Sequence, residues 1–162
     1  CSLLLTGTGS APSDESEANL MQMGALGALG ALSRSKDVSL QLKAASTLCD
    51  LSREEELGAK LVQEGGLETV ASLSVAESIE IRRFCATALR NLSAAPRNHR
   101  ALVDGRILDS CVELATANDA AIRVACAKAL SNLTYHEEGR QAMADAGCVD
   151  TLLALSHFDA SK

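Results

Sequence analysis

The residues best suited to metal, redox or nucleophilic chemistry are cysteines and histidines, and their spacing argues against these uses. They are Cys1, Cys49, Cys85, Cys111, Cys126, Cys148, His99, His136 and His157. No two cysteines form a Cys-x-x-Cys pair and no histidine has a ligand partner at helical spacing, so we expect neither a metal site nor a disulfide framework. Most cysteines fall within apolar helical patterns, where a thiol behaves as a small hydrophobic group. We expect buried free thiols, which are typical of a reducing intracellular compartment.

Motifs that build an active site are also missing from the sequence. It contains no Ser-His-Asp order with the glycines of a nucleophile elbow, no His-Glu-x-x-His pair and no P-loop. Gly24, Gly27 and Gly30 recur every three residues without the strand and spacing of a phosphate-binding loop, so we interpret them as part of a weakened helix. The acidic run Glu54–Glu56 is typical of a helix start, where negative charge complements the helix dipole. The sequence predicts neither an enzyme nor a cofactor.

The composition indicates an all-α protein with an acidic surface. Of the 162 residues, 47% are hydrophobic but only 2% are aromatic, and the net charge is −6. A core of Leu, Ala, Val, Ile and Cys favours helices over sheets, which prefer aromatic and β-branched residues. Nucleic-acid binding needs a cationic surface and, for single strands, stacking rings, and neither is present. No run of about 18 apolar residues could span a bilayer. We expect an intracellular, cytoplasmic chain, with a nuclear or cytoskeletal site left open.

The strongest signal is an internal repeat with a period of about 41 residues, and such a repeat overrides any local pattern. Leu48, Leu89 and Leu130 recur at this interval. Further apolar slots keep the interval without a gap: Leu51, Leu92 and Leu133; Leu40, Ile81 and Ile122; Leu26, Leu67, Leu108 and Val149. Within a unit the apolar residues advance by three or four, which places them on one face of a helix. One unit cannot bury that face alone, so stacked units are expected.

Polar residues at fixed repeat positions mark the helices of each unit, which we expect to be a short first helix, a middle helix and a longer third helix. The third helices should follow the N-caps Asp37, Ser78 and Asp119 and end at Ser52, Ser93 and Thr134. The middle helix should follow a sharp turn at Gly65 and Gly66, because glycine has the freest backbone. One unit later Arg106 and Ile107 replace these glycines, which makes a different turn there possible.

The first helix of each unit also carries start signals. Capping boxes are predicted from Ser52 with Glu55 and from Thr134 with Glu137, since a hydroxyl and a glutamate three residues later can satisfy two backbone donors. In the intervening copy Pro96 stands near the helix start instead.

The repeat unit as a whole resembles the armadillo repeat. The period near 41, the three helices, the segment VQEGGLETVASLS at residues 62–74 and the helix ends ALRNLS and ALSNLT carry the resemblance, which extends from about residue 18 to residue 162. It implies an all-α, right-handed α-solenoid of three-helix armadillo repeats with a period of about 41 residues. The HEAT repeat, with two helices per unit, is the alternative.

The predicted units are 18–52 with a partial first helix, 53–93, 94–134, and 135–162, which is truncated at its third helix. Residues 1–17 are interpreted as the tail of a preceding repeat plus an acidic Gly/Ser-rich insertion, with a loop composition that continues to Ala18. Ser13 and Ser16 lie among acidic residues there, in a pattern open to an acid-directed kinase. Without a third helix to cover them, Leu152 and Leu155 should be less buried than their equivalents.

The resemblance also implies a binding surface. In armadillo proteins the third helices line a concave groove, and an asparagine near the end of each holds the backbone of an extended peptide. The candidate groove residues are Asp50, Arg83, Thr87, Asn91, Lys128 and Asn132. Asn91 and Asn132 take the asparagine position, from which Asp50 departs. The importin α subfamily adds tryptophans that this sequence lacks, which argues against a nuclear import adaptor.

Basic residues on the third helices, Arg83, Arg90, Arg123 and Lys128, favour an acidic peptide, as in the β-catenin-like subfamily. We therefore predict a non-catalytic protein–protein interaction scaffold that binds an extended peptide or partner protein, next to neighbouring repeats of the same parent chain. The alternative is a structural or regulatory armadillo segment of a larger assembly, such as an axonemal or cytoskeletal component, a ubiquitin-ligase recognition domain or an autoinhibitory domain of an enzyme.

Overall fold

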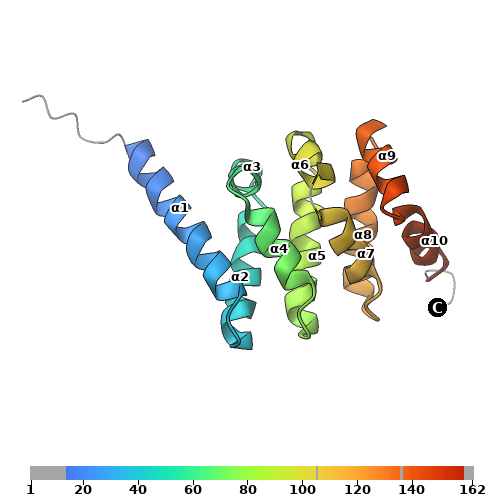
Figure 1. Ribbon diagram of the computed structural model, residues 1–162, viewed down its shortest axis with the longest axis horizontal. Coiled ribbons are helices and arrows are strands. Elements are labelled where there is room, and N and C mark those ends of the chain that lie inside the picture. Colours follow the sequence, from blue (N-terminus) through green and yellow to red (C-terminus); the bar gives the residue numbers. More distant parts are fainter. Residues whose placement is uncertain (1–13, 105, 136, 159–162) are drawn as a thin grey trace, which may run out of the picture.

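The computed structural model describes residues 14–104, 106–135 and 137–158, with side chains from residue 24 to residue 157, and consists of stacked helices (Figure 1). The helices are α1 (Asp14–Ser33), α2 (Val38–Leu51), α3 (Glu55–Gln63), α4 (Gly66–Ser74), α5 (Ile79–Ser93), the 3-10 helix η1 (Pro96–Asn98), α6 (His99–Asp104), α7 (Ile107–Ala115), α8 (Ala120–Leu133), α9 (Glu137–Asp145) and α10 (Cys148–Phe158). None of the described residues forms a strand. Within this part of the chain, no helix has the length and apolar character needed to cross a membrane.

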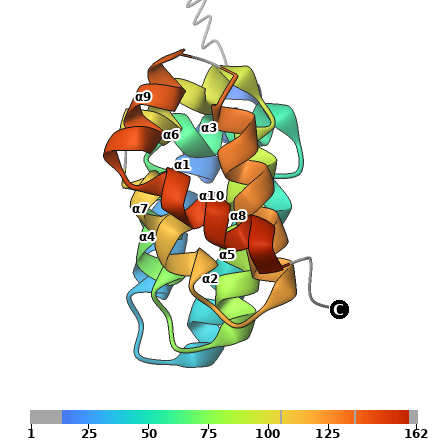
Figure 2. The ribbon, with the colours of Figure 1, turned by 90° about the vertical axis from the view of Figure 1, so that its right-hand side faces the viewer.

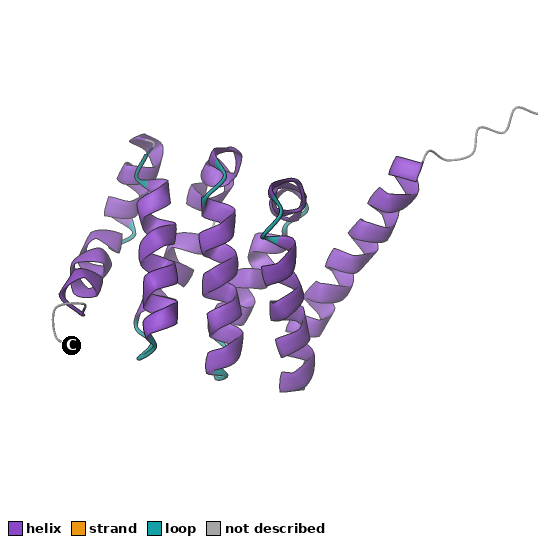
Figure 3. Cartoon of the chain, turned by 180° about the vertical axis from the view of Figure 1, so that it is seen from behind, coloured by secondary structure: helices purple, strands orange, loops and turns teal. Residues whose placement is uncertain are grey.

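The helices form three layers that repeat along the stack. Third helices α2, α5 and α8 pack side by side in one row, seen at the front of Figure 3. Middle helices α1, α4, α7 and α10 contact one another in sequence, and the first helices α3, α6 and α9 lie along one edge of both rows (Figure 2). The prediction of an all-α solenoid with three helices per unit is confirmed, because α3–α5 and η1–α8 are two complete units.

The apolar slots of the repeat form the core between units. Leu48, Leu89 and Leu130 are each at most 1% exposed. Burying one such side chain contributes about 1.5–3 kcal/mol. Small residues at another repeat position, Ala44, Cys85 and Cys126, are also buried and let neighbouring third helices approach closely. Stacking therefore supplies the burial that one unit lacks.

All three predicted N-cap residues stand at the N-caps of the third helices, and two of them make a side-chain cap bond. The Asp37 carboxylate accepts from the Ser39 backbone N–H at 2.8 Å, and Asp119 Oδ1 accepts from the Ile122 N–H at 3.0 Å. Ser78 stands at the N-cap of α5 as predicted, but its side chain does not make the expected cap bond.

Both predicted capping boxes are wrong. The Ser52 hydroxyl donates to the Cys49 carbonyl at 2.6 Å, and the Thr134 hydroxyl donates to the Ser131 carbonyl at 2.7 Å. Ser52 and Thr134 are the C-caps of α2 and α8, and the helices that follow begin only at Glu55 and Glu137, so neither hydroxyl stands at the N-cap that a capping box requires. Pro96 is the first residue of η1, in agreement with its predicted place at a helix start.

The turns into the middle helices differ between units, as the sequence indicated. Gly65 and Gly147 have φ values of 83° and 71°, in the left-handed region that side chains with a Cβ disfavour. Arg106, at the corresponding position of the intervening unit, has φ −71° and ψ 16°. That unit therefore enters its middle helix through a different turn.

The first unit departs from the prediction. A partial first helix and a separate middle helix were expected, after a loop ending at Ala18, but α1 runs without interruption from Asp14 to Ser33. The segment is rich in Ala, Leu and Met, which are strong helix formers, and its acidic start complements the helix dipole. The interpretation of residues 1–13, Ser13 included, falls outside the described residues, as does the side chain of Ser16.

The last middle helix, α10, is less covered than its predecessors. Leu152 and Leu155 are half-buried, whereas their repeat equivalents in α7, Cys111 and Leu114, are fully buried. The predicted loss of cover is confirmed.

Candidate functional site

The candidate peptide-binding residues lie on the row of third helices. Asp50, Asn91 and Asn132, here called the ladder positions, stand at the same place near the ends of α2, α5 and α8. Because α5 packs against both neighbours, the ladder positions are separated by one helix spacing each, about 8–10 Å. Asp50 is exposed and the two asparagines are half-buried. The structure therefore brings the three predicted ladder residues into one line across the stack.

Each ladder asparagine hydrogen-bonds a serine of the preceding unit. Asn91 Nδ2 donates to Ser52 Oγ, and Asn132 Nδ2 donates to Ser93 Oγ, both at 3.0 Å. Asn91 Oδ1 also accepts a longer bond of 3.3 Å from Arg90 Nη2. The sequence predicted these serines only as helix ends. One feature of the sequence could have predicted their role: a serine is followed 39 residues later by an asparagine in two successive units.

Asp50 occupies the ladder position of α2 with a different chemistry. Its carboxylate lies 3.7 Å from the Arg53 guanidinium, and both side chains are 66% exposed. An ionised carboxylate only accepts hydrogen bonds, whereas the asparagine carboxamide both donates and accepts. Asp50 therefore cannot offer a peptide carbonyl the N–H that Asn91 and Asn132 can offer.

Arg83, a predicted groove residue, is part of an ion pair between units. Its Nε and Nη2 donate to Asp119 Oδ2 at 2.9 and 2.6 Å. The other oxygen of Asp119 caps α8, so Arg83 ties α5 to the start of the next third helix. The bond from Arg83 holds the pKa of the Asp119 carboxyl below its usual value, with help from the backbone N–H of Ile122. The charge of Arg83 is thereby largely compensated within the chain.

This ion pair should make stability depend on pH. A carboxyl whose pKa is lowered by folding stabilises the folded state above its unfolded pKa of about 3.9, and this contribution is lost as the pH falls through the lowered value. The Arg83→Leu variant should therefore lose less free energy of unfolding than the wild type between about pH 5 and pH 2. Urea unfolding at several pH values measures this slope. Arg100→Leu, which removes an exposed pair with Asp104, is the control, and identical slopes for wild type and Arg83→Leu would contradict the prediction.

The other basic residues of the third helices have different surroundings. Arg123 Nε donates to the Ala117 carbonyl at 2.8 Å and so holds the loop before α8. Lys128 is exposed on α8, one turn before Asn132, and Thr87, at the equivalent place on α5, is half-buried with its hydroxyl donated to the Arg83 carbonyl. Of the four residues predicted to make the row cationic, Lys128 and Arg90 thus lie beside the ladder. Arg83 instead pairs with Asp119, and Arg123 bonds the loop before α8.

Charge is nevertheless divided between the layers. The third helices contain six basic residues and two acidic ones: Lys43, Arg82, Arg83, Arg90, Arg123 and Lys128, against Asp50 and Glu80. Helices α3, α4, α6, α7, α9 and α10 together contain ten acidic residues and three basic ones. The row that holds the ladder is therefore the basic layer of an acidic chain.

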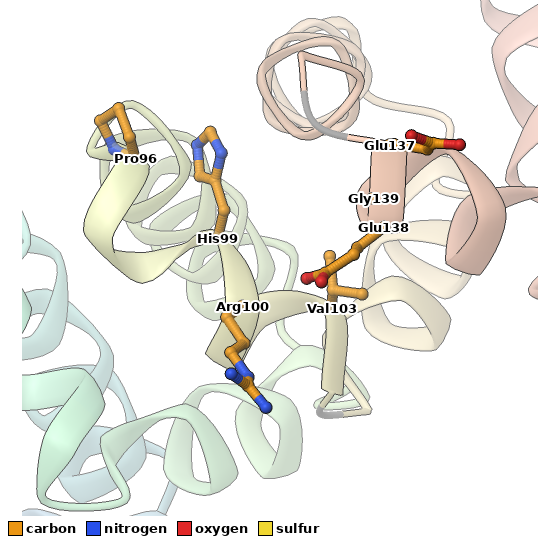
Figure 4. Close-up of a pocket in the computed structure, with 7 residues that line it drawn as sticks. All are labelled: Pro96, His99, Arg100, Val103, Glu137, Glu138 and Gly139. Carbon is orange, nitrogen blue, oxygen red and sulfur yellow. The ribbon is translucent and has the colours of Figure 1, made fainter.

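A pocket of about 440 Å³ opens between α6 and α9 (Figure 4). It is lined by Pro96, His99, Arg100, Val103, Glu137, Glu138 and Gly139. Glu138 extends toward Val103 of α6, and His99 Nε2 lies 2.7 Å from the Ser93 carbonyl oxygen. At the repeat position of Glu138, the preceding unit has Arg97, which joins η1 to the start of α3 by ion pairs with Glu55 and Glu56. At the pocket the same repeat position carries the carboxylate of Glu138 instead of a guanidinium.

The cysteines do not form a reactive or metal-binding site in the described part of the chain. The five described cysteines are free and buried. Burial raises the pKa of Cys85 and of Cys126 to about 12, so both remain thiols at neutral pH. The described residues also contain no group of three or more side chains able to hold a metal ion. The expectation of buried free thiols is confirmed for these five, and Cys1 lies outside the described residues.

Comparisons with known proteins identify the fold through solved structures. No family model and no curated protein matches the chain. An engineered protein of the Northeast Structural Genomics Consortium is 28% identical over 93% of this chain, with a TM-score of 0.76. A designed armadillo repeat protein in complex with the peptide (KR)4 is 20% identical over 92%, and a computationally designed one for modular peptide recognition is 21% identical over 86%, each with a TM-score of 0.75. The chain spans 37–63% of the lengths of these three proteins.

Stacked three-helix units whose repeated apolar positions are buried define a helical-repeat solenoid. Its similarity to designed armadillo repeat proteins identifies the chain more closely: it has an armadillo-like repeat fold.

Proposed function

We propose that this chain is a non-catalytic scaffold that binds an extended peptide segment across α2, α5 and α8. The observation that carries the proposal is the alignment of Asn91 and Asn132 on adjacent third helices, each held by the same contact to the preceding unit. A carboxamide can donate to a peptide carbonyl and accept from a peptide N–H, which are the groups that an extended backbone leaves unsatisfied. The structural similarity to a designed armadillo repeat protein in complex with a peptide supports this function.

The partner that fits this surface best is acidic. The third helices form the basic layer, and Lys128 is exposed beside Asn132. A carboxylate of the peptide near Lys128 would form an exposed ion pair, which contributes at most about 1 kcal/mol and weakens with salt. Affinity should therefore come mainly from the backbone contacts at the asparagines, with charge setting the preference among peptides. Thr87, Arg83 and Asp50 line the same path and would limit which side chains fit.

A titration tests the proposal. The three ladder positions span two helix spacings, which an extended chain crosses in about six residues. A peptide of about 12 residues therefore covers the ladder and extends beyond it at both ends. A fluorescein-labelled peptide of alternating glutamate and serine should bind with an affinity that falls about tenfold in the Asn91→Ala, Asn132→Ala double variant, as measured by fluorescence anisotropy.

The matched control is Asn118→Ala, which removes an exposed asparagine outside the third helices and should leave the affinity unchanged. The same peptide with lysine in place of glutamate should bind more weakly. Equal affinity of the double variant and the wild type would refute binding at the ladder.

A structural or regulatory role within a larger assembly is the second candidate. It is favoured by the exposed apolar side chains of α10, where Val149 and Leu153 are 51% and 54% exposed. Such residues are suited to packing against another protein element. For either role we infer an intracellular, cytoplasmic location, because buried reduced thiols are typical of that compartment.

A further inference from the structure

We propose that Ser52 and Ser93 are positioning residues of the ladder. Each fixes the carboxamide of the asparagine in the next unit, so that this carboxamide is already oriented when a peptide binds. The inference rests on the proposed function and adds two residues that no peptide would touch. Ser52 and Ser93 are only 4% and 1% exposed, so they act through Asn91 and Asn132.

The serine hydroxyls are themselves held in one orientation. Ser52 Oγ donates to the Cys49 carbonyl at 2.6 Å, and Ser93 Oγ donates to the Arg90 carbonyl at 2.8 Å. Because the hydroxyl proton is used in this bond, the oxygen lone pairs are available to accept from the asparagine Nδ2, which lies 3.0 Å away in both units. A helix carbonyl, a buried hydroxyl and a carboxamide thus form a chain of hydrogen bonds across each unit boundary.

This chain of bonds leaves the asparagine with the groups that a peptide needs. A carboxamide has two N–H donors and one acceptor oxygen, and the serine takes one donor. One N–H and Oδ1 remain, which match one carbonyl and one N–H of an extended backbone. Holding the carboxamide in place beforehand reduces the ordering cost of binding.

The two asparagines are not equivalent. Asn91 Oδ1 accepts the 3.3 Å bond from Arg90, which a peptide N–H would have to replace. No described residue hydrogen-bonds Asn132 Oδ1, so the boundary between α5 and α8 should be the stronger peptide contact. The ladder position of α2 is occupied by Asp50, which has no carboxamide N–H to donate to a peptide.

The chain supplies its own conservative replacement for the serine. Thr134 stands at the repeat position of Ser52 and Ser93, and its hydroxyl donates to the carbonyl three residues earlier at 2.7 Å in the same way. Threonine therefore preserves the hydroxyl geometry at this position. Ser93→Thr should keep the contact to Asn132, and Ser93→Ala should remove it.

The test combines affinity with a direct measurement on Asn132. For the labelled glutamate–serine peptide, Ser93→Ala should weaken binding about three- to tenfold, and Ser93→Thr should stay within about twofold of the wild type. In an Asn132→Ala background, Ser93→Ala should have no further effect on affinity, because the serine acts only through that asparagine. In NMR spectra of the protein alone, the order parameter of the Asn132 side-chain amide should fall in Ser93→Ala and recover in Ser93→Thr.

The outcomes separate this inference from the function on which it rests. An affinity that is lost in Asn132→Ala but retained in Ser93→Ala, or an Asn132 amide whose order parameter is unchanged by Ser93→Ala, would overturn the positioning role alone. Unchanged affinity in both Asn132→Ala and the double ladder variant would overturn peptide binding itself. Thermal melts establish that each variant is folded at the titration temperature. If Ser93→Ala is unfolded, the same comparison is made with Ser52→Ala in place of Ser93→Ala and with Asn91 in place of Asn132.

Discussion

Replacing Leu89 by alanine is expected to lower the free energy of unfolding by about 2–5 kcal/mol. Leu89 is 1% exposed and belongs to the core that joins α5 to the helices around it. The truncation removes buried methyl groups and leaves a cavity that the neighbouring helices can only partly fill. Because α5 packs against both α2 and α8, the loss falls on two unit boundaries at once. Urea unfolding followed by circular dichroism measures the change.

Val75→Ala is the matched control for this truncation. Val75 follows α4 and is 68% exposed, so its side chain has little burial to lose. Its effect should be within about 0.5 kcal/mol of zero, as is usual for exposed positions. A Leu89→Ala curve that superimposes on the wild type would mean that the core described here is not the one that holds the stack together.

Adding a single methyl group at Gly139 should also be strongly destabilising. A Cβ at this position would lie 2.1 Å from the backbone oxygen of Leu133, well inside the distance of any allowed contact. The clash involves backbone, so α9 itself must move away from the end of α8. Overpacking of this kind costs about 1–3 kcal/mol, and we expect Gly139→Ala to reach or exceed the upper end. A lower melting temperature in differential scanning calorimetry would report it.

Gly27→Ala provides the control, because it adds the same methyl group where there is room. A Cβ at Gly27 would have no atom within 4 Å, and the residue lies inside α1. This variant should be more stable than the wild type by about 0.5–1 kcal/mol, because alanine restricts the unfolded chain more than glycine does. If Gly139→Ala melts at or above the wild-type temperature, the close approach of α9 to α8 is incorrect.

The carbonyl that excludes a side chain at Gly139 has a counterpart one unit earlier. At that position Asn98 is buried, and its Nδ2 donates to the Leu92 carbonyl at 3.0 Å. The two units therefore differ in what lies against the last carbonyls of the third helix. In one unit the Asn98 amide hydrogen-bonds such a carbonyl, and in the other Gly139, which has no side chain, packs close to it. The repeat period alone could not have predicted this difference.

The fold was predictable because burial repeats with the sequence. Leu48, Leu89 and Leu130 recur once in each unit. Each unit therefore has an apolar face that a neighbouring unit must cover, and this requires the units to stack. The first unit was mispredicted because its pattern of apolar residues suits both two short helices and one long one. Helix propensity and the absence of a breaker between Asp14 and Gly24 favour the continuous α1.

The candidate site was only partly predictable. The asparagine positions came from the resemblance, and the structure aligns Asn91 with Asn132 across adjacent helices. The partners of these residues could not be predicted, because they depend on how two units pack. Arg83 pairs with Asp119 of the next unit, and an arginine in a helix pattern is more often a solvated surface residue. The serine contacts were hidden for the same reason, since their hydroxyls already had a plausible local use at the helix end.

The distribution of the cysteines provides a way to follow motion within the solenoid. The five described thiols lie on five different helices, α2, α5, α7, α8 and α10, and all are buried. An alkylating reagent can modify each one only when its own helix opens, so the rate of mass gain at each sulfur reports local opening under native conditions. A ligand that bridges α2, α5 and α8 should slow alkylation of Cys49, Cys85 and Cys126 more than that of Cys111 and Cys148.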